Sequence, residues 1–212
     1  MATLLLLIRH GLTDTAGKRL SGHARGVDLN QRGREQAVRL VERLAPVPVL
    51  AIYSSSLERC VQTAAPLAEA RGLEIHRLDS LRDVDYGGWT NRNIAQVRKT
   101  KLWLRLMAAP ADARFPGGET TREVQSRIVG EVASIVGRHP RAAIAVFSHA
   151  DPIKLVLAHY LGVHLDLYPR IVVNPASISA VAAGDGVPRV LKVNDTGGLV
   201  DIAPPRPRKA GR

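Results

Sequence analysis

Short apolar runs alternate along this chain with longer stretches whose apolar residues recur at helical spacing. The continuous runs cover Thr3–Ile8, Val49–Tyr53 and Ala142–Phe147. Further strands, in which polar residues interrupt the apolar ones, are predicted at Leu73–Leu78, Ile178–Ala183 and Val190–Val193. Continuous apolar runs of this length are typical of strands buried on both faces of a sheet. The helical stretches lie between Asn30 and Pro46, after Ser56 with a bend or interruption at Pro66, over Ile94–Met107 and Glu119–Val136, and from His149 through Leu161. This alternation predicts an α/β fold, a three-layer α/β/α sandwich around a mostly parallel sheet.

The size and apolar content of the chain fit one soluble domain, since it has 212 residues of which 45% are hydrophobic and 23% charged. We expect this domain to span residues 1–203, with a lid or insert at about residues 90–118 and a basic flexible tail at 204–212. The first apolar run is too short for a signal peptide or a membrane span. The single cysteine, Cys60, cannot form an internal disulfide. The sequence therefore predicts a cytoplasmic protein that does not associate with a membrane.

A formal net charge of +11 attracts anions, and nucleic acid is the first class of partner to weigh. Part of this excess of positive charge lies in the predicted tail at 204–212. Another part lies in a segment without Asp or Glu, Tyr86–Ala111, whose cations are Arg92, Arg98, Lys99, Lys101 and Arg105. That segment is either a solvated helical face or a positively charged cover over a pocket. Aromatic residues make up only 4% of the chain, which is little for base stacking, so nucleic acid is not favoured as a partner.

Polar residues follow three of the predicted strands at the point where each strand ends. They are Arg9-His10-Gly11, the run from Ser54 to Ser56 that leads to Arg59, and Ser148-His149. Ligand sites of parallel sheets lie at the carboxyl ends of the strands, so we expect these groups to share one site.

Five blocks that include these strand ends carry a family resemblance. They are Arg9-His10-Gly11, Ser54 to Ala64, Leu81 to Trp89, Phe115 to Glu119, and Val146 to Ala150. In this order they resemble the histidine phosphatase superfamily, in its phosphoglycerate-mutase-like branch, from about Thr3 to Gly198. The resemblance implies that superfamily's three-layer α/β fold and a reaction through a phosphohistidine.

The resemblance also implies roles for particular residues. His10 would be the nucleophile that takes the phosphoryl group, and Arg9 and Arg59 would hold the phosphate oxygens. His149 would be a further donor to the phosphate, and Asp83 would protonate the leaving oxygen. The loop after His10 adds candidate substrate contacts at Thr13, Ser21 and Gly22. The last block, Val146 to Ala150, adds Ala150.

These residue types suit phosphoryl transfer on physical grounds. The reaction needs charge stabilisation around the phosphorus and a nucleophile in line with the leaving oxygen. Arginine binds phosphate through a planar fork that stays charged, and neutral imidazole is a competent nucleophile near pH 7. A departing alkoxide needs a proton, which calls for a carboxylic acid with a raised pKa.

The sequence departs from its relatives in two places. Asp83 stands where the superfamily usually has glutamate, so the carboxyl group is one methylene shorter, and Asp85 is a second candidate for the proton donor. If this segment is a strand, both side chains point to the same face. Ala16 stands where relatives commonly have asparagine and offers no side-chain donor to the phosphate.

The remaining residues of interest favour structural roles. No HExxH or CxxC motif is present, and His23, His76, His139, His159 and His164 lack metal-ligand spacing, so we expect no metal and no cofactor. Cys60 is expected to pack on an apolar helix face. Trp89 and Trp103 are expected to pack in a lid or in the core.

The leading hypothesis is a metal-independent phosphatase that hydrolyses a small phosphorylated metabolite through phospho-His10. The alternative in the same pocket is a phosphoglycerate or sugar-phosphate mutase, although mutases of this type are typically longer between the acid block and the last histidine. A hypothesis from another class is a non-catalytic protein that binds phosphorylated ligands or nucleic acid. A homodimer fits each hypothesis, and the sequence leaves the oligomeric state open.

Overall fold

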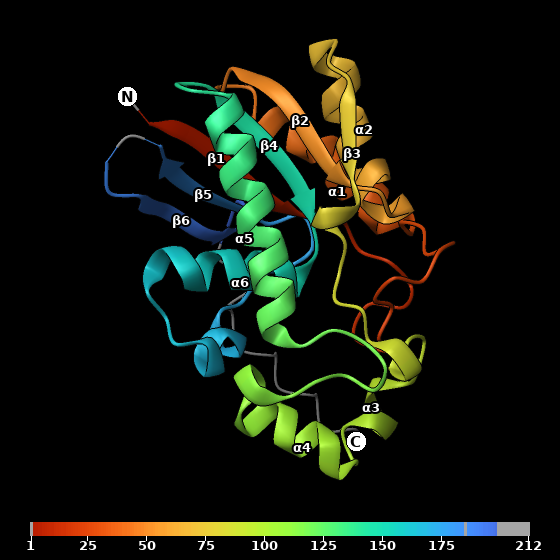
Figure 1. The fold of residues 1–212 in the computed structure, drawn as a ribbon. Helices are drawn as coiled ribbons and strands as arrows, with labels where there is room; N and C mark the ends of the chain where they lie inside the picture. The colour runs from red at the N-terminus through yellow and green to blue at the C-terminus, as the bar shows by residue number, and fades with distance from the viewer. Residues whose placement is uncertain (1, 185, 199–212) are drawn as a thin grey trace, which may run out of the picture.

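The sheet at the centre of the molecule has six strands in the order β3-β2-β4-β1-β5-β6 (Figure 1). The computed structural model describes residues 2–184 and 186–198. The strands are Thr3–Arg9 (β1), Val49–Ser55 (β2), Ile75–Leu78 (β3), Ala143–Ser148 (β4), Ile178–Ala183 (β5) and Arg189–Asp195 (β6). Strands β1 to β4 pair in parallel, while β5 and β6 pair antiparallel. The predicted α/β class and mostly parallel sheet are confirmed.

Helices cover both faces of this sheet. They are Gln31–Arg43 (α1), Glu58–Arg71 (α2), Ile94–Val97 (α3), Lys101–Ala108 (α4), Thr121–Arg138 (α5) and Ala150–Leu161 (α6), with short 3-10 turns at Asp79–Leu81, Gly87–Trp89, Pro110–Asp112 and Leu165–Arg170. Helices α1 and α2 pack on one face, and α5 and α6 pack on the other. This is the three-layer arrangement that the alternation of runs predicts.

Strand β1 contributes to both apolar cores because its side chains alternate between the two faces of the sheet. Leu5 and Leu7 are buried in the core under α5 and α6, whereas Leu6 and Ile8 are buried in the core under α1 and α2. Burial on both faces explains why the run has no polar alternation. A strand that is apolar almost throughout is therefore suited to the interior position that β1 takes in the sheet.

Side-chain caps set where several helices begin. The Asn30 carboxamide oxygen accepts a hydrogen bond from Gly33 N at 2.9 Å at the start of α1. At the start of α5, Thr120 and Glu123 form a reciprocal capping box. Such caps satisfy backbone N–H groups that have no partner within the helix.

Three predicted elements differ from those observed. Helix α2 continues through Pro66 without interruption, held on the core by Cys60, Ala64 and Leu67. Strand β3 begins at Ile75 instead of Leu73, because Gly72 ends α2 with a left-handed turn (φ 63°).

The third difference is that the helix predicted over Ile94–Met107 is divided into α3 and α4. Thr100 starts a new helix there, since its hydroxyl oxygen accepts a hydrogen bond from Trp103 N at 3.2 Å. A side-chain cap inside an apparently continuous pattern explains the break.

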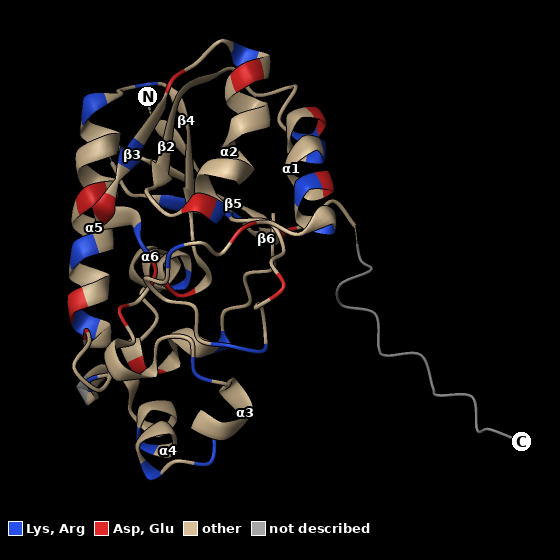
Figure 2. Cartoon of the chain, turned by 90° about the vertical axis from the view of Figure 1, so that its right-hand side faces the viewer, with Lys and Arg blue, Asp and Glu red and all other residues tan. Residues whose placement is uncertain are grey.

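The segment that carries α3 and α4 lies beyond the carboxyl ends of the parallel strands (Figure 1). The Trp89 and Trp103 rings lie 6.3 Å apart and pack against the core, which confirms their expected packing role. The segment from α3 to α4 carries Lys and Arg without Asp or Glu (Figure 2). The tail predicted at 204–212 lies outside the described residues, and the extent of the domain and the lid remain predictions. No helix in the described ranges is long and apolar enough to cross a membrane.

Candidate active site

Three neighbouring strands bring the predicted catalytic residues together. Strands β1 and β4 are paired so that Arg9 lies opposite Ser148, and His10 N donates to Ser148 O at 3.0 Å. The next residues along the two strands are therefore His10 and His149, whose ring centroids are 5.2 Å apart. Strand β2 lies on the other side of β4 and leads into α2, whose first turn carries Arg59.

The His10 ring is fixed in the tautomer that a nucleophile needs. Its Nδ1 lies 2.7 Å from the carbonyl oxygen of Gly11, an acceptor, so Nδ1 carries the proton and Nε2 keeps its lone pair. Burial lowers the pKa of His10 well below its usual value, and the charges of Arg9 and Arg59 lower it further. The imidazole is therefore neutral at physiological pH.

Gly11 allows the chain to turn closely from β1 toward α1. A Cβ atom at Gly11 would lie 2.6 Å from the carbonyl oxygen of Gly33, so no larger residue fits without moving the backbone. Gly11 N also donates to Thr63 Oγ1 at 2.9 Å, which ties the loop to α2. These contacts hold the backbone next to His10.

Arg9 is half-buried and Arg59 is buried, and carbonyl groups hold both guanidinium groups. Arg9 NH1 donates to Val173 O at 2.7 Å, and no acceptor among the described residues reaches Arg9 Nε. Arg59 is 1% exposed and donates from NH2 to Gly22 O at 2.7 Å. Fixed positive groups of this kind can bind an anion without reorganising.

His149 supports Arg59 from behind. Its Nδ1 accepts a hydrogen bond from Arg59 Nε at 3.3 Å, so its Nε2 carries the proton and donates to Ser55 Oγ at 2.9 Å. Burial, with a contribution from Arg59, lowers the pKa of His149 well below its usual value. Protein groups thus engage both ring nitrogens, and the donor role of His149 toward a phosphate stays a prediction.

Asp83 faces the same cavity as His10, whereas Asp85 does not line it. Asp83 Oδ2 lies 3.5 Å from Arg59 NH2 and 3.8 Å from His149 Nδ1. Burial raises the pKa of Asp83 to about 6, against the lowering effect of Arg59 and with a further raising effect of Asp151.

The Asp85 carboxylate stabilises a turn. Its Oδ1 accepts a hydrogen bond from Gly87 N at 2.8 Å. The segment around Asp83 and Asp85 has no regular secondary structure, which corrects the assumption that the two side chains share one face of a strand.

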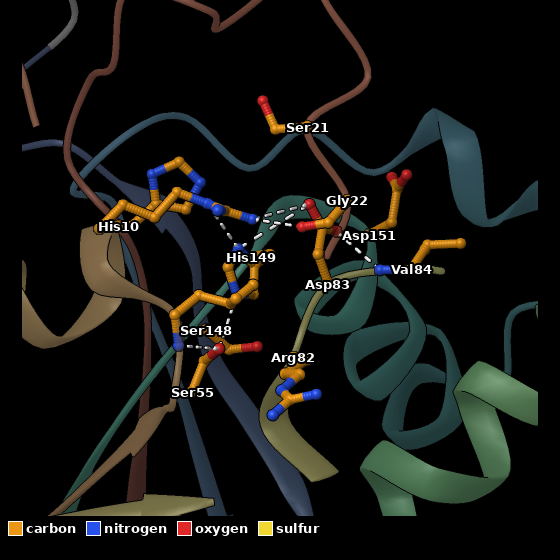
Figure 3. A network of polar contacts seen from close by, with 12 residues as sticks. His10, Ser21, Gly22, Ser55, Arg82, Asp83, Val84, Ser148, His149 and Asp151 are labelled. Atoms are coloured by element: carbon orange, nitrogen blue, oxygen red, sulfur yellow. Dashed lines mark hydrogen bonds and ion pairs between the residues drawn. The ribbon is translucent and has the colours of Figure 1, made fainter. Parts of the chain in front are cut away.

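The cavity has a volume of about 140 Å³, and Figure 3 shows His10, Asp83 and Asp151 among its lining residues. Its lining residues are Arg9, His10, Thr13, Ala16, Gly17, Arg19, Leu20, Ser21, Arg59, Asp83, Tyr86, Ile94, Ala150 and Asp151. The hydroxyl groups of Thr13 and Ser21 are linked through Thr15, at 3.1 and 2.9 Å. Gly22 lies behind the cavity, where its carbonyl group holds Arg59. A buried imidazole, two arginines and a carboxyl group of raised pKa thus share a space that fits a phosphate and a few further atoms.

Comparison with known proteins identifies the family of this chain. Residues 5–196 match the histidine phosphatase superfamily, branch 1. The chain belongs to this superfamily.

Several members of the superfamily resemble the chain over most of its length. Phosphoserine phosphatase 1 of Hydrogenobacter thermophilus is 29% identical over 197 residues, which cover 91% of this chain and 92% of that protein. A probable phosphoglycerate mutase, GpmB of Salmonella choleraesuis, is 29% identical over 178 residues, 82% of each chain. The structure of a mycobacterial glucosyl-3-phosphoglycerate phosphatase with VO3 is 28% identical, with a TM-score of 0.82 over 91% of this chain and 98% of that one. Proteins similar to this histidine phosphatase superfamily member are thus named both as phosphatases and as a mutase.

Four residues of this superfamily member contribute to the site through contacts that the sequence patterns did not predict. His23 Nε2 lies 2.8 Å from the carbonyl oxygen of Asp83, so this histidine contacts the backbone of the predicted proton donor. Arg127 donates to the same carbonyl group at 3.1 Å, Ser55 holds His149, and Asp151 lines the cavity. The contacts of His23, Arg127 and Ser55 join residues 60, 44 and 94 positions apart in the sequence, and such contacts leave no periodic signal.

Other polar features of the molecule do not reproduce this chemistry. A larger surface cleft of about 580 Å³ lies between α1 and the end of β6, and its charged residues are Arg32, Glu35, Arg39 and Arg43. Within residues 2–184 and 186–198, no three His, Cys, Asp or Glu side chains gather in a way that could hold a metal ion. Burial raises the pKa of Cys60 to about 12, so this thiol beside His149 stays protonated and packs as an apolar group.

Proposed function

We propose that this protein is a phosphatase that hydrolyses small phosphate monoesters through a phosphohistidine on His10. The observation that carries the proposal is one small cavity that joins a neutral His10, with a free Nε2, to Asp83, whose pKa is raised to about 6. Arg9 and Arg59 supply the positive charge. A volume of about 140 Å³ leaves room for the phosphate and a short alcohol, which favours a small metabolite.

In the first step, His10 Nε2 attacks the phosphorus atom and the bond from phosphorus to the ester oxygen breaks. The proton of Asp83 passes to that oxygen, so an alcohol leaves and a carboxylate remains. Arg9 and Arg59 stabilise the charge on the other phosphate oxygens. His149 and the Gly22 carbonyl group keep Arg59 in place, since both bond to its guanidinium group.

In the second step, water attacks the phosphorus atom and the bond from phosphorus to Nε2 breaks. The Asp83 carboxylate takes the proton of this water, so inorganic phosphate leaves and both residues return to their starting states. The same carboxyl group serves as acid and then as base, which a pKa near neutrality permits.

A mutase would share the first step and differ in the second, because the phosphoryl group would return to a hydroxyl group of the substrate. The short chain between Asp83 and His149 favours hydrolysis: α3 and α4 are the only α-helices that the described chain adds between β3 and α5. Incubation with 3-phosphoglycerate distinguishes the two outcomes. A phosphatase releases inorganic phosphate in proportion to substrate consumed, whereas a mutase gives the 2-phospho isomer.

His10→Ala tests the mechanism directly. We expect kcat for p-nitrophenyl phosphate to fall by roughly three orders of magnitude or more, the scale on which loss of a nucleophile acts. The wild type is expected to keep its activity in EDTA and to yield an acid-labile phosphoryl label on His10. His159→Ala, at an exposed histidine on α6, is the matched control and should keep full activity. Turnover retained in His10→Ala, a label on another residue, or loss of wild-type activity in EDTA would each contradict the proposal.

A further inference from the structure

One acidic group in the cavity takes no direct part in the proposed bond-making and bond-breaking steps. Asp151 lies in the first turn of α6, two residues after His149, and lines the cavity with His10 and Asp83. A carboxylate in this place repels the phosphate dianion that the arginines attract. A negative residue favours a helix N-terminus, yet a side chain turned to solvent would serve that purpose equally. The position of Asp151 inside the cavity therefore points to a group that it binds.

The neighbours of Asp151 leave part of its hydrogen-bonding capacity free. Lys154 Nζ donates to Oδ1 at 3.0 Å, and the Tyr86 hydroxyl group donates to Oδ2 at 3.2 Å. A carboxylate offers about four lone pairs, so each oxygen can accept a further bond. Lys154 does not line the cavity, and the Asp151 side chain is 24% exposed. The pair with Lys154 thus holds Asp151 from outside and leaves its carboxylate accessible from within.

The cavity has two ends that contact different parts of a substrate. Arg9, His10 and Arg59 define the phosphate end. In an in-line reaction the leaving oxygen points away from His10, toward the acid that protonates it. Asp151 lies beside Asp83, and Figure 3 shows both on the same side of His149, away from His10. Tyr86, whose hydroxyl group donates to Asp151, lines the cavity at this end. Asp151 is therefore placed next to the alcohol portion of the substrate.

We propose that Asp151 binds an ammonium group of that alcohol, so that the preferred substrates are phosphate monoesters of short amino alcohols. This inference rests on the proposed phosphatase function. An ammonium group is favoured over a hydroxyl group because a charge-assisted bond is about twice as strong as a neutral one. It also offsets the repulsion between the carboxylate and the phosphate dianion, since the substrate carries the compensating charge itself.

Asp151→Asn tests the inference with two alkyl esters of equal shape. Phosphoethanolamine and n-propyl phosphate differ only in an ammonium group against a methyl group. We expect the wild type to prefer phosphoethanolamine by roughly tenfold in kcat/KM, mostly through KM, and Asp151→Asn to bring the ratio close to one. The ratio cancels any effect that the substitution has on Asp83, because both esters release a similar alcohol. His159→Ala, at an exposed position of the same helix, is the control and should keep the preference.

Each other result has a distinct meaning. An equal fall on both esters leaves the ratio unchanged and overturns the inference, because Asp151 then acts only through Asp83. Equal use of 2-hydroxyethyl phosphate and phosphoethanolamine overturns the choice of an ammonium group. Absence of turnover on p-nitrophenyl phosphate would contradict the phosphatase function itself. In that case a shift in melting temperature of the wild type by phosphoethanolamine, compared with n-propyl phosphate, still decides whether Asp151 binds a cation.

Discussion

At the scale of single residues, the environment of each group sets what it can do. Asp83 and Asp85 are two carboxyl groups two positions apart, yet the first faces a buried cavity and the second accepts a hydrogen bond from Gly87 N. Desolvation raises the pKa of Asp83 to about 6, while the bond to Gly87 commits Asp85 to a turn. The side chain of Asp83 is shorter than that of glutamate, yet it still places Oδ2 3.5 Å from Arg59 NH2, within the group that would hold the phosphate.

Asp83→Asn is expected to slow alkyl esters more than aryl esters. An alkoxide needs a proton as it leaves, whereas a nitrophenolate hardly does, so kcat should fall by roughly a hundredfold or more for n-propyl phosphate and only a few-fold for p-nitrophenyl phosphate. The measurement is kcat for both esters in wild type, Asp83→Asn and the matched control Asp85→Asn. Equal losses on the two esters in Asp83→Asn, or a selective loss in Asp85→Asn, would assign the proton to another group.

The same variant should be more stable than the wild type at high pH. The folded state raises the pKa of Asp83 above its unfolded value of about 3.9, so its contribution to stability is complete below that pH and is lost as the pH rises through about 6. Asn avoids this loss, so Asp83→Asn should gain up to about 3 kcal/mol at pH 8 and nothing at pH 4. Urea unfolding at the two pH values measures the difference. A variant that loses stability at pH 8 would show that the Asp83 carboxylate holds the fold together.

At the scale of elements, the cavity is built from connections that other elements hold in place. The connection from β3 that carries Asp83 has only a 3-10 turn at Asp79–Leu81, and Arg127 of α5 binds three of its carbonyl groups, those of Ser80, Arg82 and Asp83. Arg127 also pairs with both carboxylate oxygens of Glu119, at 2.9 and 2.8 Å. A helix on one face of the sheet thereby positions the proposed proton donor.

Arg127→Met is expected to lower stability by about 2 kcal/mol, because three carbonyl groups and a half-buried carboxylate lose their donor. We also expect a lower kcat for alkyl esters with little change in KM, as Arg127 acts on the position of Asp83 and does not touch substrate. Arg138→Met, on the same helix at a side chain 47% exposed, should cost less than about 1 kcal/mol and leave kcat unchanged. If Arg127→Met and Arg138→Met have the same kcat, Arg127 contributes to the stability of α5 and does not position Asp83.

At the scale of the whole molecule, the net charge of +11 is spread over several surfaces. Figure 2 shows Lys and Arg interleaved with Asp and Glu on α1 and α5, and unaccompanied around α4. The cavity itself holds Arg9, Arg19 and Arg59 against Asp83 and Asp151. A distribution of this kind attracts small anions from many directions without forming one basic groove.

Salt is therefore expected to weaken substrate binding. Raising ionic strength from about 50 to about 500 mM should increase KM for a phosphate monoester by roughly two- to fivefold, since the Debye length shrinks, while kcat stays constant. Steady-state kinetics over this range of ionic strength measure KM and kcat. Duplex DNA added as a competitor should not inhibit. A KM independent of salt, or inhibition by DNA at low salt, would contradict this account of the charge.

The sequence by itself determined the layered α/β fold and the strand ends that carry Arg9, His10, Arg59 and His149. Apolar periodicity decides which residues can be buried, and parallel strands bring their carboxyl ends to one edge, so these features follow from local pattern. Only the tertiary structure decided that β1 lies between β4 and β5, that Asp83 faces the cavity in place of Asp85, and that Asp151 joins it. The contacts of Arg127 and His23 with the Asp83 backbone likewise span 44 and 60 positions of sequence. Such contacts depend on how finished elements pack, and no local spacing encodes them.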